Sequence, residues 1–462
     1  AGNGVSVRLF EGPRPTPELS FAIRRYGCMA GINITASHNP KQYNGYKVYW
    51  SDGAQLPPRH ADAVARERDK VSVFEGVKAV SRAEAEKYIT VMGEETDAAY
   101  LDAVFAQSLA GGETRRAARD MKLVYTPFHG CGRELVPRIL RRAGFESVVP
   151  VPEQMTADGD FPTVKSPNPE DKEGFALAVA LAEREQADLI IGTDPDADRV
   201  GIMIRGQDGY ITLSGNQTGV LLLDYILKAR RENGIMPEKA AFVKTIVTTP
   251  MAAAVAQKVG VPSYDTFTGF KFLAEKIAEL EADGARFVLA YEESYGYLVG
   301  DQARDKDAVV ASMLIAEMAA YYKTKGMTLY DAMEALYAEH GRYAEETVSI
   351  VMPGVDGLEN MKKLMKRLRE QPYTEIAGVP VAALRDYLSG ERRVMPQGAS
   401  GPVKPEGSDV LCCEMADGTL FLIRPSGTEP KLKVYIMTRG ADKAECEAKI
   451  GAYKAFAREE LR

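Results

Sequence analysis

A unit of strand, Thr-Pro, helix and glycine occurs three times in the chain, and this repeat limits the possible folds more than any other feature of the sequence. The strand-like runs lie at residues 5–10, 123–125 and 242–247. The pairs that follow them are Thr16-Pro17, Thr126-Pro127 and Thr249-Pro250, and the helical stretches end near Gly27, Gly144 and Gly260. A unit repeated in this way is typical of related structural modules. The chain is therefore expected to contain three related α/β domains.

Each unit is followed by a second apolar strand that ends in a polar cluster. These strands lie at residues 30–34, 188–192 and 286–290, and the polar segments after them are 35–40, 193–199 and 291–296. Open α/β sheets bind their ligands at the carboxyl ends of the strands. Each of the three domains is therefore expected to offer one functional loop.

The expected fold class is α/β, with three related mixed-sheet α/β domains followed by a C-terminal α+β domain. The expected domain boundaries are 1–120, 121–208, 209–341 and 342–462, with residues 111–119 interpreted as a polar connector. In the last domain we expect a strand at 346–352, a basic amphipathic helix at 357–370, a loop rich in Pro, Gly and Ser at 393–409, and a closing helix at 442–461.

The charge balance and the cysteines narrow the classes of function. The chain of 462 residues carries a net charge of -7 and no long run of Lys and Arg, which argues against nucleic-acid binding. No apolar run approaches the length needed to span a membrane. The five cysteines are scattered and form no CxxC pair, which indicates reduced thiols and a cytoplasmic setting.

Ser37 lies in the polar segment that follows the strand at 30–34, and Asn39-Pro40 breaks regular structure just after it. The sequence therefore predicts a serine hydroxyl on a constrained turn at a strand end. Taken alone, the segment is equally compatible with an Asn-Pro turn that contains an incidental serine.

Three carboxylates, Asp194, Asp196 and Asp198, alternate within the second polar segment. Carboxylates this close repel one another unless a cation lies among them, and oxygen ligands favour a hard ion such as Mg²⁺. An EF-hand loop is excluded, because its sixth and twelfth positions would be Arg199 and Arg205 instead of Gly and Glu. A solvated acidic turn remains the alternative.

The third polar segment combines Glu292 with Ser294 among three tyrosines. A carboxylate can accept two hydrogen bonds from a vicinal diol, and tyrosine rings offer flat apolar surface to a sugar ring. The alternative is an acidic surface loop with packed tyrosines. Three basic residues lie near this segment in the sequence: Lys271 before it, and Arg304 and Lys306 after it. Each of them could also be a solvated surface charge.

A further loop near the C-terminus has the residue types that bind anions. It contains Arg424, Ser426, Gly427, Thr428 and Lys431. A guanidinium, an ammonium, two hydroxyls and exposed backbone N–H groups suit a phosphate. The GxxxxGK[ST] spacing of a Walker loop is absent. A polar hairpin turn is the alternative.

The motifs resemble, in order and spacing, those of the α-D-phosphohexomutase family, and most closely those of its phosphoglucomutase branch. The segments that carry the resemblance are TASHNP (35–40), NGYK (44–47), DPDADR (194–199), EES (292–294) and RPSGTEPK (424–431). The resemblance covers essentially the whole chain. It implies a four-domain, heart-shaped enzyme with a central active-site cleft.

The resemblance also implies a role for each motif. Ser37 would carry the phosphoryl group, His38 and Lys47 would assist proton transfer, and the three aspartates with Ser37 would hold Mg²⁺. The residues implied to bind the sugar phosphate are Arg199, Lys271, Glu292, Ser294, Arg304 and Lys306. Those implied to bind the phosphate that is not transferred are Arg424, Ser426, Gly427 and Thr428. The four domains would then be the phosphoserine, metal-binding, sugar-binding and phosphate-binding domains.

The activity implied is that of a phosphoglucomutase, which interconverts glucose 1-phosphate and glucose 6-phosphate through a phosphoserine and glucose 1,6-bisphosphate, the latter also serving as activator. The same chemistry on mannose or pentose phosphates is the nearest alternative. A metal-dependent sugar phosphatase with Asp194 as nucleophile, or a non-enzymatic sugar-phosphate-binding protein, would use fewer of the motifs. We expect a monomer or homodimer that binds a small sugar phosphate and neither nucleic acid nor membrane.

One part of the family pattern is absent from the sequence. The first domain of the family begins with a strand and a Gly-rich segment that bears an active-site arginine, and nothing in the chain matches it. The sequence opens with Ala1 instead of Met. The expectation is that the gene product has an N-terminal segment that precedes this chain.

Overall fold

The computed structural model describes residues 1–352, 356–396, 398–426 and 430–461. The chain divides into two compact units, which are described separately. The first contains residues 1–242 and 269–330, and the second contains residues 243–268 and 331–462. In the described part of the chain, no helix has both the length and the apolar character that crossing a membrane requires.

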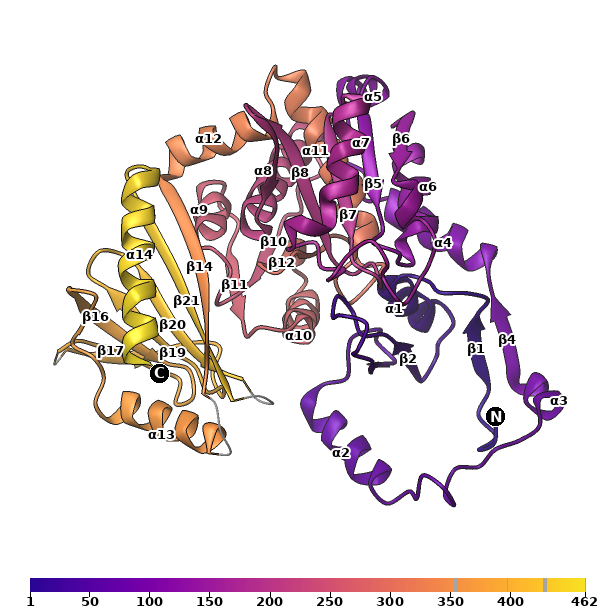
Figure 1. Ribbon diagram of the computed structural model, residues 1–462, viewed down its shortest axis with the longest axis horizontal. Helices are drawn as coiled ribbons and strands as arrows, with labels where there is room; N and C mark the ends of the chain where they lie inside the picture. The colour runs from indigo at the N-terminus through magenta and orange to yellow at the C-terminus, as the bar shows by residue number, and fades with distance from the viewer. Residues whose placement is uncertain (353–355, 397, 427–429, 462) are drawn as a thin grey trace. The chain divides into compact units, whose positions relative to one another are not determined.

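The first α/β domain is built on two separate pairs of strands (Figure 1). β1 (Val7–Phe10) pairs in parallel with β4 (Ile89–Met92), and β2 (Ala30–Ile34) pairs antiparallel with β3 (Tyr46–Trp50). The helices are α1 (Thr16–Arg25), α2 (Pro58–Arg68), α3 (Arg82–Ala85), η1 (Glu86–Tyr88) and α4 (Glu94–Phe105). Pro17 lies in the first turn of α1, where its missing N–H costs nothing, and this explains why the helix begins here.

The second α/β domain contains a five-stranded mixed sheet with the order β6-β5-β7-β8-β9. The strands are β5 (Lys122–Thr126), β6 (Ser147–Pro150), β7 (Leu189–Thr193), β8 (Val200–Gly206) and β9 (Gly209–Leu213). β5 and β7 are parallel and almost fully buried, which is why they appear in the sequence as continuous apolar runs. The antiparallel partner β8 follows β7 after only six residues, so the segment between them forms a tight loop at the carboxyl end of β7.

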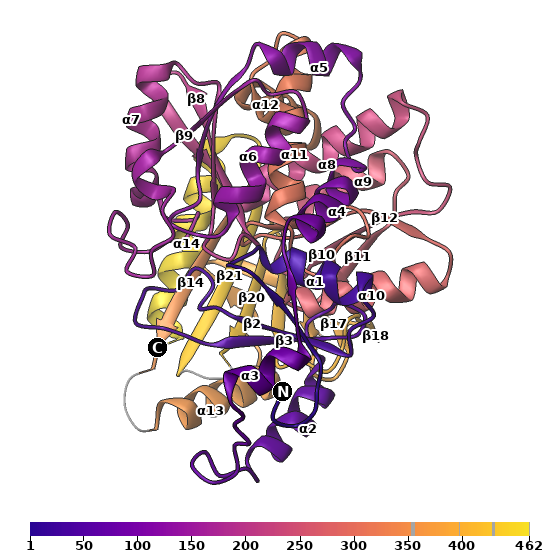
Figure 2. The ribbon, with the colours of Figure 1, turned by 90° about the vertical axis from the view of Figure 1, so that its right-hand side faces the viewer.

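Helices cover this sheet and connect it to the third α/β domain. The helices of the second domain are α5 (Gly112–Arg119), α6 (Gly132–Arg142), η2 (Pro152–Gln154), η3 (Lys172–Phe175) and α7 (Ala176–Glu185). α7 packs Ala178 and Leu181 against Val124 and Ile190 of the sheet. The long helix α11 (Ala308–Thr324) of the third domain contacts α5, α6 and α8 (Gly215–Glu232) (Figure 2). Because neighbours surround it, α11 is buried on nearly every face.

The third α/β domain contributes to both units. In the first unit, β12 (Arg286–Glu292) pairs antiparallel with β13 (Gly296–Leu298), and α8 and α10 (Phe270–Ala282) pack against β12. β10 (Ala240–Thr245) runs from the first unit into the second, where α9 (Pro250–Lys258) and β11 (Ser263–Thr266) follow. Asp307 caps α11 by accepting hydrogen bonds from the N–H groups of Val309 and Val310.

The C-terminal domain is α+β, with an antiparallel sheet in the order β14-β21-β20-β19-β16-β17-β18 and β15 on β16. Its strands are β14 (Arg342–Val351), β15 (Glu375–Ile376), β16 (Val379–Asp386), β17 (Glu391–Val394), β18 (Ser400–Pro402), β19 (Leu411–Met415), β20 (Leu420–Pro425) and β21 (Lys431–Gly440). Its helices are α13 (Gly357–Glu370) and α14 (Lys443–Glu460), and α12 (Leu329–His340) closes the third α/β domain that precedes it. α13 and α14 share one apolar core with the sheet, in which Met361, Met365 and Tyr453 meet Phe421 and Val434.

The fold class expected from the sequence is confirmed: three related α/β domains precede an α+β domain. The helix expected at 357–370 is present with the same bounds. The interpretation of 111–119 as a polar connector is wrong, because residues 112–119 form α5. Thr114 and Ala118 are buried on the side of α5 that packs against α11, and the arginines that made the segment look like a connector lie mostly outward. Part of the loop expected at 393–409 is the short strand β18.

Gly219 of α8 sets how closely that helix approaches β12. A Cβ added at Gly219 would lie 2.3 Å from Cε2 of Tyr291, a fully buried ring. We expect Gly219→Ala to lower the free energy of unfolding by about 1–3 kcal/mol, as overpacking of a core does. Chemical denaturation measures this change.

Gly451 of α14 provides the matched control, because it is an exposed helical glycine whose added Cβ would meet nothing within 4 Å. Gly451→Ala should be neutral or stabilise the protein by roughly 0.5–1 kcal/mol, since alanine loses less backbone entropy in a helix. Equal effects of the two substitutions would show that α8 does not pack against β12 as described.

Candidate active site

Three loops of the first unit follow the carboxyl ends of β2, β7 and β12, and each holds a non-glycine residue in the left-handed region. These residues are Ser37 (φ 53°), Ala197 (φ 49°) and Tyr295 (φ 66°). Such a conformation costs roughly 1–3 kcal/mol and persists only where neighbouring contacts enforce it. Backbone strain of this kind is concentrated at functional sites. The three loops predicted from the sequence therefore share an unusual local structure.

The turn that carries Ser37 is fixed by its own side chains. The backbone N–H of Ser37 donates to Oγ1 of Thr35 over 2.8 Å, and Nδ2 of Asn39 donates to the carbonyl oxygen of Ala36 over 3.0 Å. Ser37 Oγ then lies 3.4 Å from Oδ2 of Asp194 and 3.3 Å from Nδ1 of His38. The hydroxyl is thus presented to the loop after β7.

His38 and Lys47, which follow Ser37 in the sequence, differ in charge: the imidazole is neutral and the ammonium is positive. Burial and the nearby Arg199 guanidinium lower the pKa of His38 to about 4, so its imidazole is neutral at pH 7. Burial alone would lower the pKa of Lys47, but the carboxylates of Asp196 and Asp198 raise it well above its usual value. The site therefore contains one neutral base and one permanent cation close to Ser37.

The three aspartates after β7 converge although each is buried. One carboxylate oxygen from each lies within 4.8 Å of the others. Oδ1 of Asp194 accepts the backbone N–H groups of Asp198 and Arg199, over 3.1 and 2.9 Å. Oδ1 of Asp196 and Oδ1 of Asp198 are buried and have no hydrogen-bond partner among the described residues, although Nε of Arg199 lies 3.9 Å from Oδ1 of Asp198. Unpartnered buried carboxylate oxygens are costly, and a hard divalent cation such as Mg²⁺ would satisfy them.

Two lysines neutralise part of this charge. Nζ of Lys47 lies 2.8 Å from Oδ2 of Asp196 and 2.9 Å from Oδ2 of Asp198, and Nζ of Lys306 lies 3.2 Å from the same Asp198 oxygen. Burial opposes ionisation of Asp198, but Lys306, Lys47 and Arg199 hold its pKa well below the usual range. For Asp194, burial and the two neighbouring carboxylates raise the pKa well above its usual value. The cluster therefore still favours binding of a further positive charge.

The loop after β12 contributes a buried carboxylate. Oε1 of Glu292 accepts the backbone N–H of Gly269 over 2.7 Å. Burial raises the pKa of Glu292, and the neighbouring Lys306 ammonium opposes that shift. The structure thus brings Glu292 and Lys306 to the aspartate cluster, as well as Ser37, His38, Lys47 and Arg199.

Asp305 contacts a residue of the candidate site and was not identified from the sequence. Its Oδ1 accepts Nζ of Lys306 over 2.9 Å, and its Oδ2 accepts the hydroxyl of Tyr49 over 2.7 Å. Through these two bonds, Asp305 holds the Lys306 ammonium next to Asp198 and connects Lys306 to Tyr49 of β3. Its place between two basic residues, Arg304 and Lys306, was the only signal in the sequence.

Within the first unit, three other predicted residues make no described contact with the aspartate cluster. Nζ of Lys271 lies 5.1 Å from the ring centroid of Phe272, Arg304 pairs with Glu281 at 2.8 Å, and Ser294 is half-buried on its loop. In the second unit, Nη1 of Arg424 donates to the hydroxyl of Tyr435, and the N–H of Ser426 donates to the Lys431 carbonyl. Gly427 and Thr428 lie outside the described residues.

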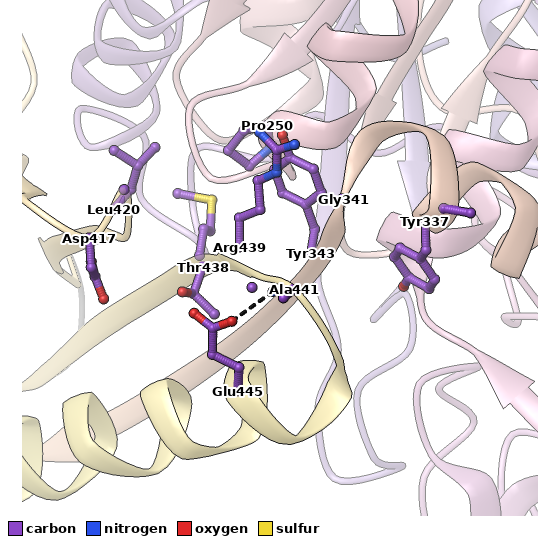
Figure 3. Close-up of a pocket in the computed structure, with 14 residues that line it drawn as sticks. Pro250, Tyr337, Gly341, Tyr343, Asp417, Leu420, Thr438, Arg439, Ala441 and Glu445 are labelled. Atoms are coloured by element: carbon purple, nitrogen blue, oxygen red, sulfur yellow. Dashed lines mark hydrogen bonds between the residues drawn. The ribbon is translucent and has the colours of Figure 1, made fainter.

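The second unit also contains a cavity of about 760 Å³ that is separate from these predictions (Figure 3). Tyr337, Tyr343, Arg439 and Glu445 lie along it, with the Arg439 guanidinium 5.6 Å from the ring centroid of Tyr343. Of the predicted site residues that the structure describes, none lines this cavity. It is therefore not part of the candidate site.

Comparison with known proteins gives one consistent family. Residues 1–73, 98–207 and 214–340 match the models of phosphoglucomutase/phosphomannomutase α/β/α domains I, II and III. The phosphoglucomutase of Staphylococcus aureus strain N315 is 36% identical over 453 residues, which cover 98% of this chain and 80% of that protein.

Two solved structures show the same fold. Parafusin, a phosphoglucomutase from Paramecium, in its open form, has a TM-score of 0.67 at 20% identity, over 97% of this chain and 82% of that one. The N-acetylphosphoglucosamine mutase of Aspergillus fumigatus, in complex with GlcNAc-6P and magnesium, has a TM-score of 0.52 at 15% identity, over 96% and 91%.

We expect Mg²⁺ to raise the midpoint of thermal unfolding, because the ion relieves repulsion among the buried aspartates. A ligand at about 100 times its Kd stabilises a native protein by about 2.7 kcal/mol. Asp196→Asn should lose most of this Mg²⁺-dependent shift, since one of the three carboxylates is removed. Differential scanning fluorimetry with Mg²⁺ and with a chelator measures it.

Asp208, an exposed aspartate in the turn between β8 and β9, serves as control. Asp208→Asn should keep the full shift. A wild-type protein that is indifferent to millimolar Mg²⁺, or an Asp196→Asn variant that still responds fully, would exclude the aspartates as a cation site.

Proposed function

The chain belongs to the phosphoglucomutase/phosphomannomutase family, and from this premise we propose that it interconverts α-D-glucose 1-phosphate and glucose 6-phosphate. The family makes it a mutase, an isomerase that moves a phosphoryl group within a sugar. The choice of glucose rests on the similarity to phosphoglucomutases at 36% identity. The observation that carries the mechanism is Ser37 Oγ, held 3.4 Å from the aspartate cluster on a strained turn.

In the proposed reaction Ser37 carries the phosphoryl group in the resting enzyme. A sugar hydroxyl oxygen forms a new bond to phosphorus while the bond between phosphorus and Ser37 Oγ breaks. The hydroxyl proton leaves to a base, and Ser37 Oγ regains a proton. The bisphosphorylated sugar then turns over, and Ser37 takes back the other phosphoryl group, so that atoms and charge balance over the cycle.

The chain supplies a proton acceptor for these steps and a cation that offsets part of the negative charge of the phosphoryl group. His38 is neutral and within 3.3 Å of Ser37 Oγ, so it can accept a proton there. The Lys47 ammonium lies among the aspartates and offsets negative charge as the phosphoryl group is transferred. We assign Asp194, Asp196 and Asp198, with Ser37, as the residues that hold Mg²⁺. The ion would stabilise the charge on the phosphoryl oxygens.

The sugar phosphate is proposed to contact residues from several loops. Glu292 and Ser294 would bind sugar hydroxyls, and the cations proposed to contact the phosphates are Arg199, Lys271, Arg304 and Lys306. The loop proposed to hold the phosphate that is not transferred consists of Arg424, Ser426, Gly427 and Thr428. We also propose glucose 1,6-bisphosphate as activator, a monomeric or dimeric enzyme and a cytoplasmic location. The five free thiols, four of them buried, support a reducing compartment.

The phosphoserine is tested by mass and by kinetics. We expect purified active protein to carry phosphate on Ser37 in peptide mass spectra. Dephosphorylated protein should be nearly inactive until a trace of glucose 1,6-bisphosphate restores the phosphoserine, because an unmodified hydroxyl is a weak nucleophile. Ser37→Ala should fold normally and fail to respond.

The exposed Ser51 provides the control, and Ser51→Ala should keep both activity and activation. A Ser37→Ala variant that isomerises glucose 1-phosphate at the wild-type rate would refute the mechanism. Release of inorganic phosphate without isomerisation would indicate a phosphatase instead.

Glu292 is tested by its contribution to substrate recognition. Glu292→Ala should lower kcat/KM for glucose 1-phosphate by an amount equivalent to about 1.5–3 kcal/mol, the scale of a hydrogen bond to a charged group. Coupled assays on glucose, mannose and pentose 1-phosphates measure the loss for each sugar. Glu279→Ala, on the exposed side of α10, is the control that should leave kcat/KM unchanged. An unchanged kcat/KM in Glu292→Ala would remove Glu292 from the site.

A further inference from the structure

Thr16, the first residue of α1, contacts the aspartate loop twice. Its backbone N–H is one of the first-turn donors that have no partner within a helix. This N–H donates to the carbonyl oxygen of Asp196 over 2.8 Å. The Thr16 hydroxyl also donates to Oδ2 of Asp196 over 3.0 Å. Thr16 is fully buried, although it lies 180 positions from Asp196 in the sequence.

Asn33 of β2 determines where the Thr16 hydroxyl points. Nδ2 of Asn33 donates to Oγ1 of Thr16 over 2.7 Å. An amide N–H can only donate, so the hydroxyl is the acceptor in this bond and its single proton is directed to Asp196. Asn33 also lies directly opposite Lys47 in the pairing of β2 with β3. The pair of strands β2 and β3 therefore supplies both the amide that orients the Thr16 hydroxyl and the lysine that donates to Oδ2 of Asp196.

The two oxygens of Asp196 are consequently in different states. Oδ2 accepts a hydrogen bond from Thr16 over 3.0 Å and one from Nζ of Lys47 over 2.8 Å. Oδ1 is buried and accepts no hydrogen bond from the residues that the structure describes. Rotation of the carboxylate would break both bonds to Oδ2, so these contacts hold the unpartnered oxygen in one position.

The Thr-Pro pairs of the other two repeats make different contacts. Oγ1 of Thr126 accepts the N–H of Phe128 and donates to Gln154, both within its own domain. Oγ1 of Thr249 accepts the N–H of Met251 in the helix that it caps. The N-cap of α1 has no such side-chain bond. Because the Thr126 hydroxyl bonds within its own domain, the bond that the Thr16 hydroxyl makes to another domain does not occur in every repeat.

We propose that Thr16 and Asn33 are positioning residues that present Oδ1 of Asp196 to the divalent cation. They also connect the strand that leads to Ser37 with the cation-binding loop. This inference depends on one part of the proposed function, namely that Asp196 is a cation ligand. Residues that orient a metal ligand from behind typically change metal affinity or activity 10–100-fold when they are lost.

Substitutions at Thr16 that differ only in the hydroxyl test this proposal. Mn²⁺ serves as the probe, because it favours oxygen ligands and free Mn²⁺ is quantified by electron paramagnetic resonance in the absence of substrate. Thr16→Val keeps the shape of the side chain but removes the donor, and should weaken Mn²⁺ binding roughly 10-fold or more. Thr16→Ser keeps the hydroxyl and should bind Mn²⁺ within about twofold of the wild type.

Asn33→Asp is a second, independent variant. Its carboxylate would accept the Thr16 proton and turn the hydroxyl away from Asp196, so Mn²⁺ binding should weaken as in Thr16→Val. In activity assays, both variants should need more metal for half-maximal rate while KM for the sugar phosphate stays unchanged. A general loss of structure would change both constants and the thermal midpoint.

Two outcomes would overturn the proposal, and they differ in what they imply. If the wild type binds Mn²⁺ and a folded Thr16→Val or Asn33→Asp variant binds it equally well, the positioning role is wrong and the proposed function stands. If the wild type binds no Mn²⁺, then Asp196 is not a cation ligand and the metal assignment of the proposed function fails too. The Ser37 phosphorylation experiment remains independent of both.

Discussion

The stability of the first unit depends on how the charges of three carboxylates that are buried together are compensated. Asp194, Asp196 and Asp198 are each at most 5% exposed. Buried charges of like sign destabilise a protein unless opposite charges or hydrogen bonds compensate. The compensating groups come from distant elements: the ammonium of Lys47 from β3, that of Lys306 from the segment before α11, and the hydroxyl of Thr16 from α1. Bringing these groups together requires all three α/β domains to take part in one site.

This arrangement is also compatible with the anionic substrate that we propose for an acidic protein. The chain carries a net charge of -7, so its average field repels phosphates. Lys47, Lys306 and Arg199 concentrate positive charge at the aspartate loop, and Asp198 in turn holds the two lysines in place. The aspartates therefore have two functions in the proposed reaction. They are a cation site, and they also anchor the basic side chains that a phosphate would meet.

The strained turns place the reacting groups against this cluster. Ser37 and Ala197 lie in left-handed conformations on loops of two different domains, yet Ser37 Oγ and Asp194 come within 3.4 Å. The first unit tolerates this strain because the turns are tied by local bonds, such as that from Ser37 N–H to Thr35, and by contacts between domains, such as those of Thr16. The structure thus places a hydroxyl, a neutral imidazole and a charged cluster together before any substrate binds.

The sequence by itself determined the features that depend on local pattern. The strands expected at 30–34, 188–192 and 286–290, the alternating aspartates and the helix at 357–370 follow from periodicity, turn residues and short-range spacing, and β2, β7 and β12 lie within two residues of the expected strands. Only the tertiary structure decided which of the distant side chains meet. Lys47 and Asp196 are 149 positions apart, and α5, whose Thr114 and Ala118 are buried, packs against α11 from another domain. Lys306 reaches the cluster while Arg304, two residues away, pairs with Glu281 instead. A linear pattern cannot distinguish such neighbours, because their contacts are set by the packing of elements that are remote in the chain.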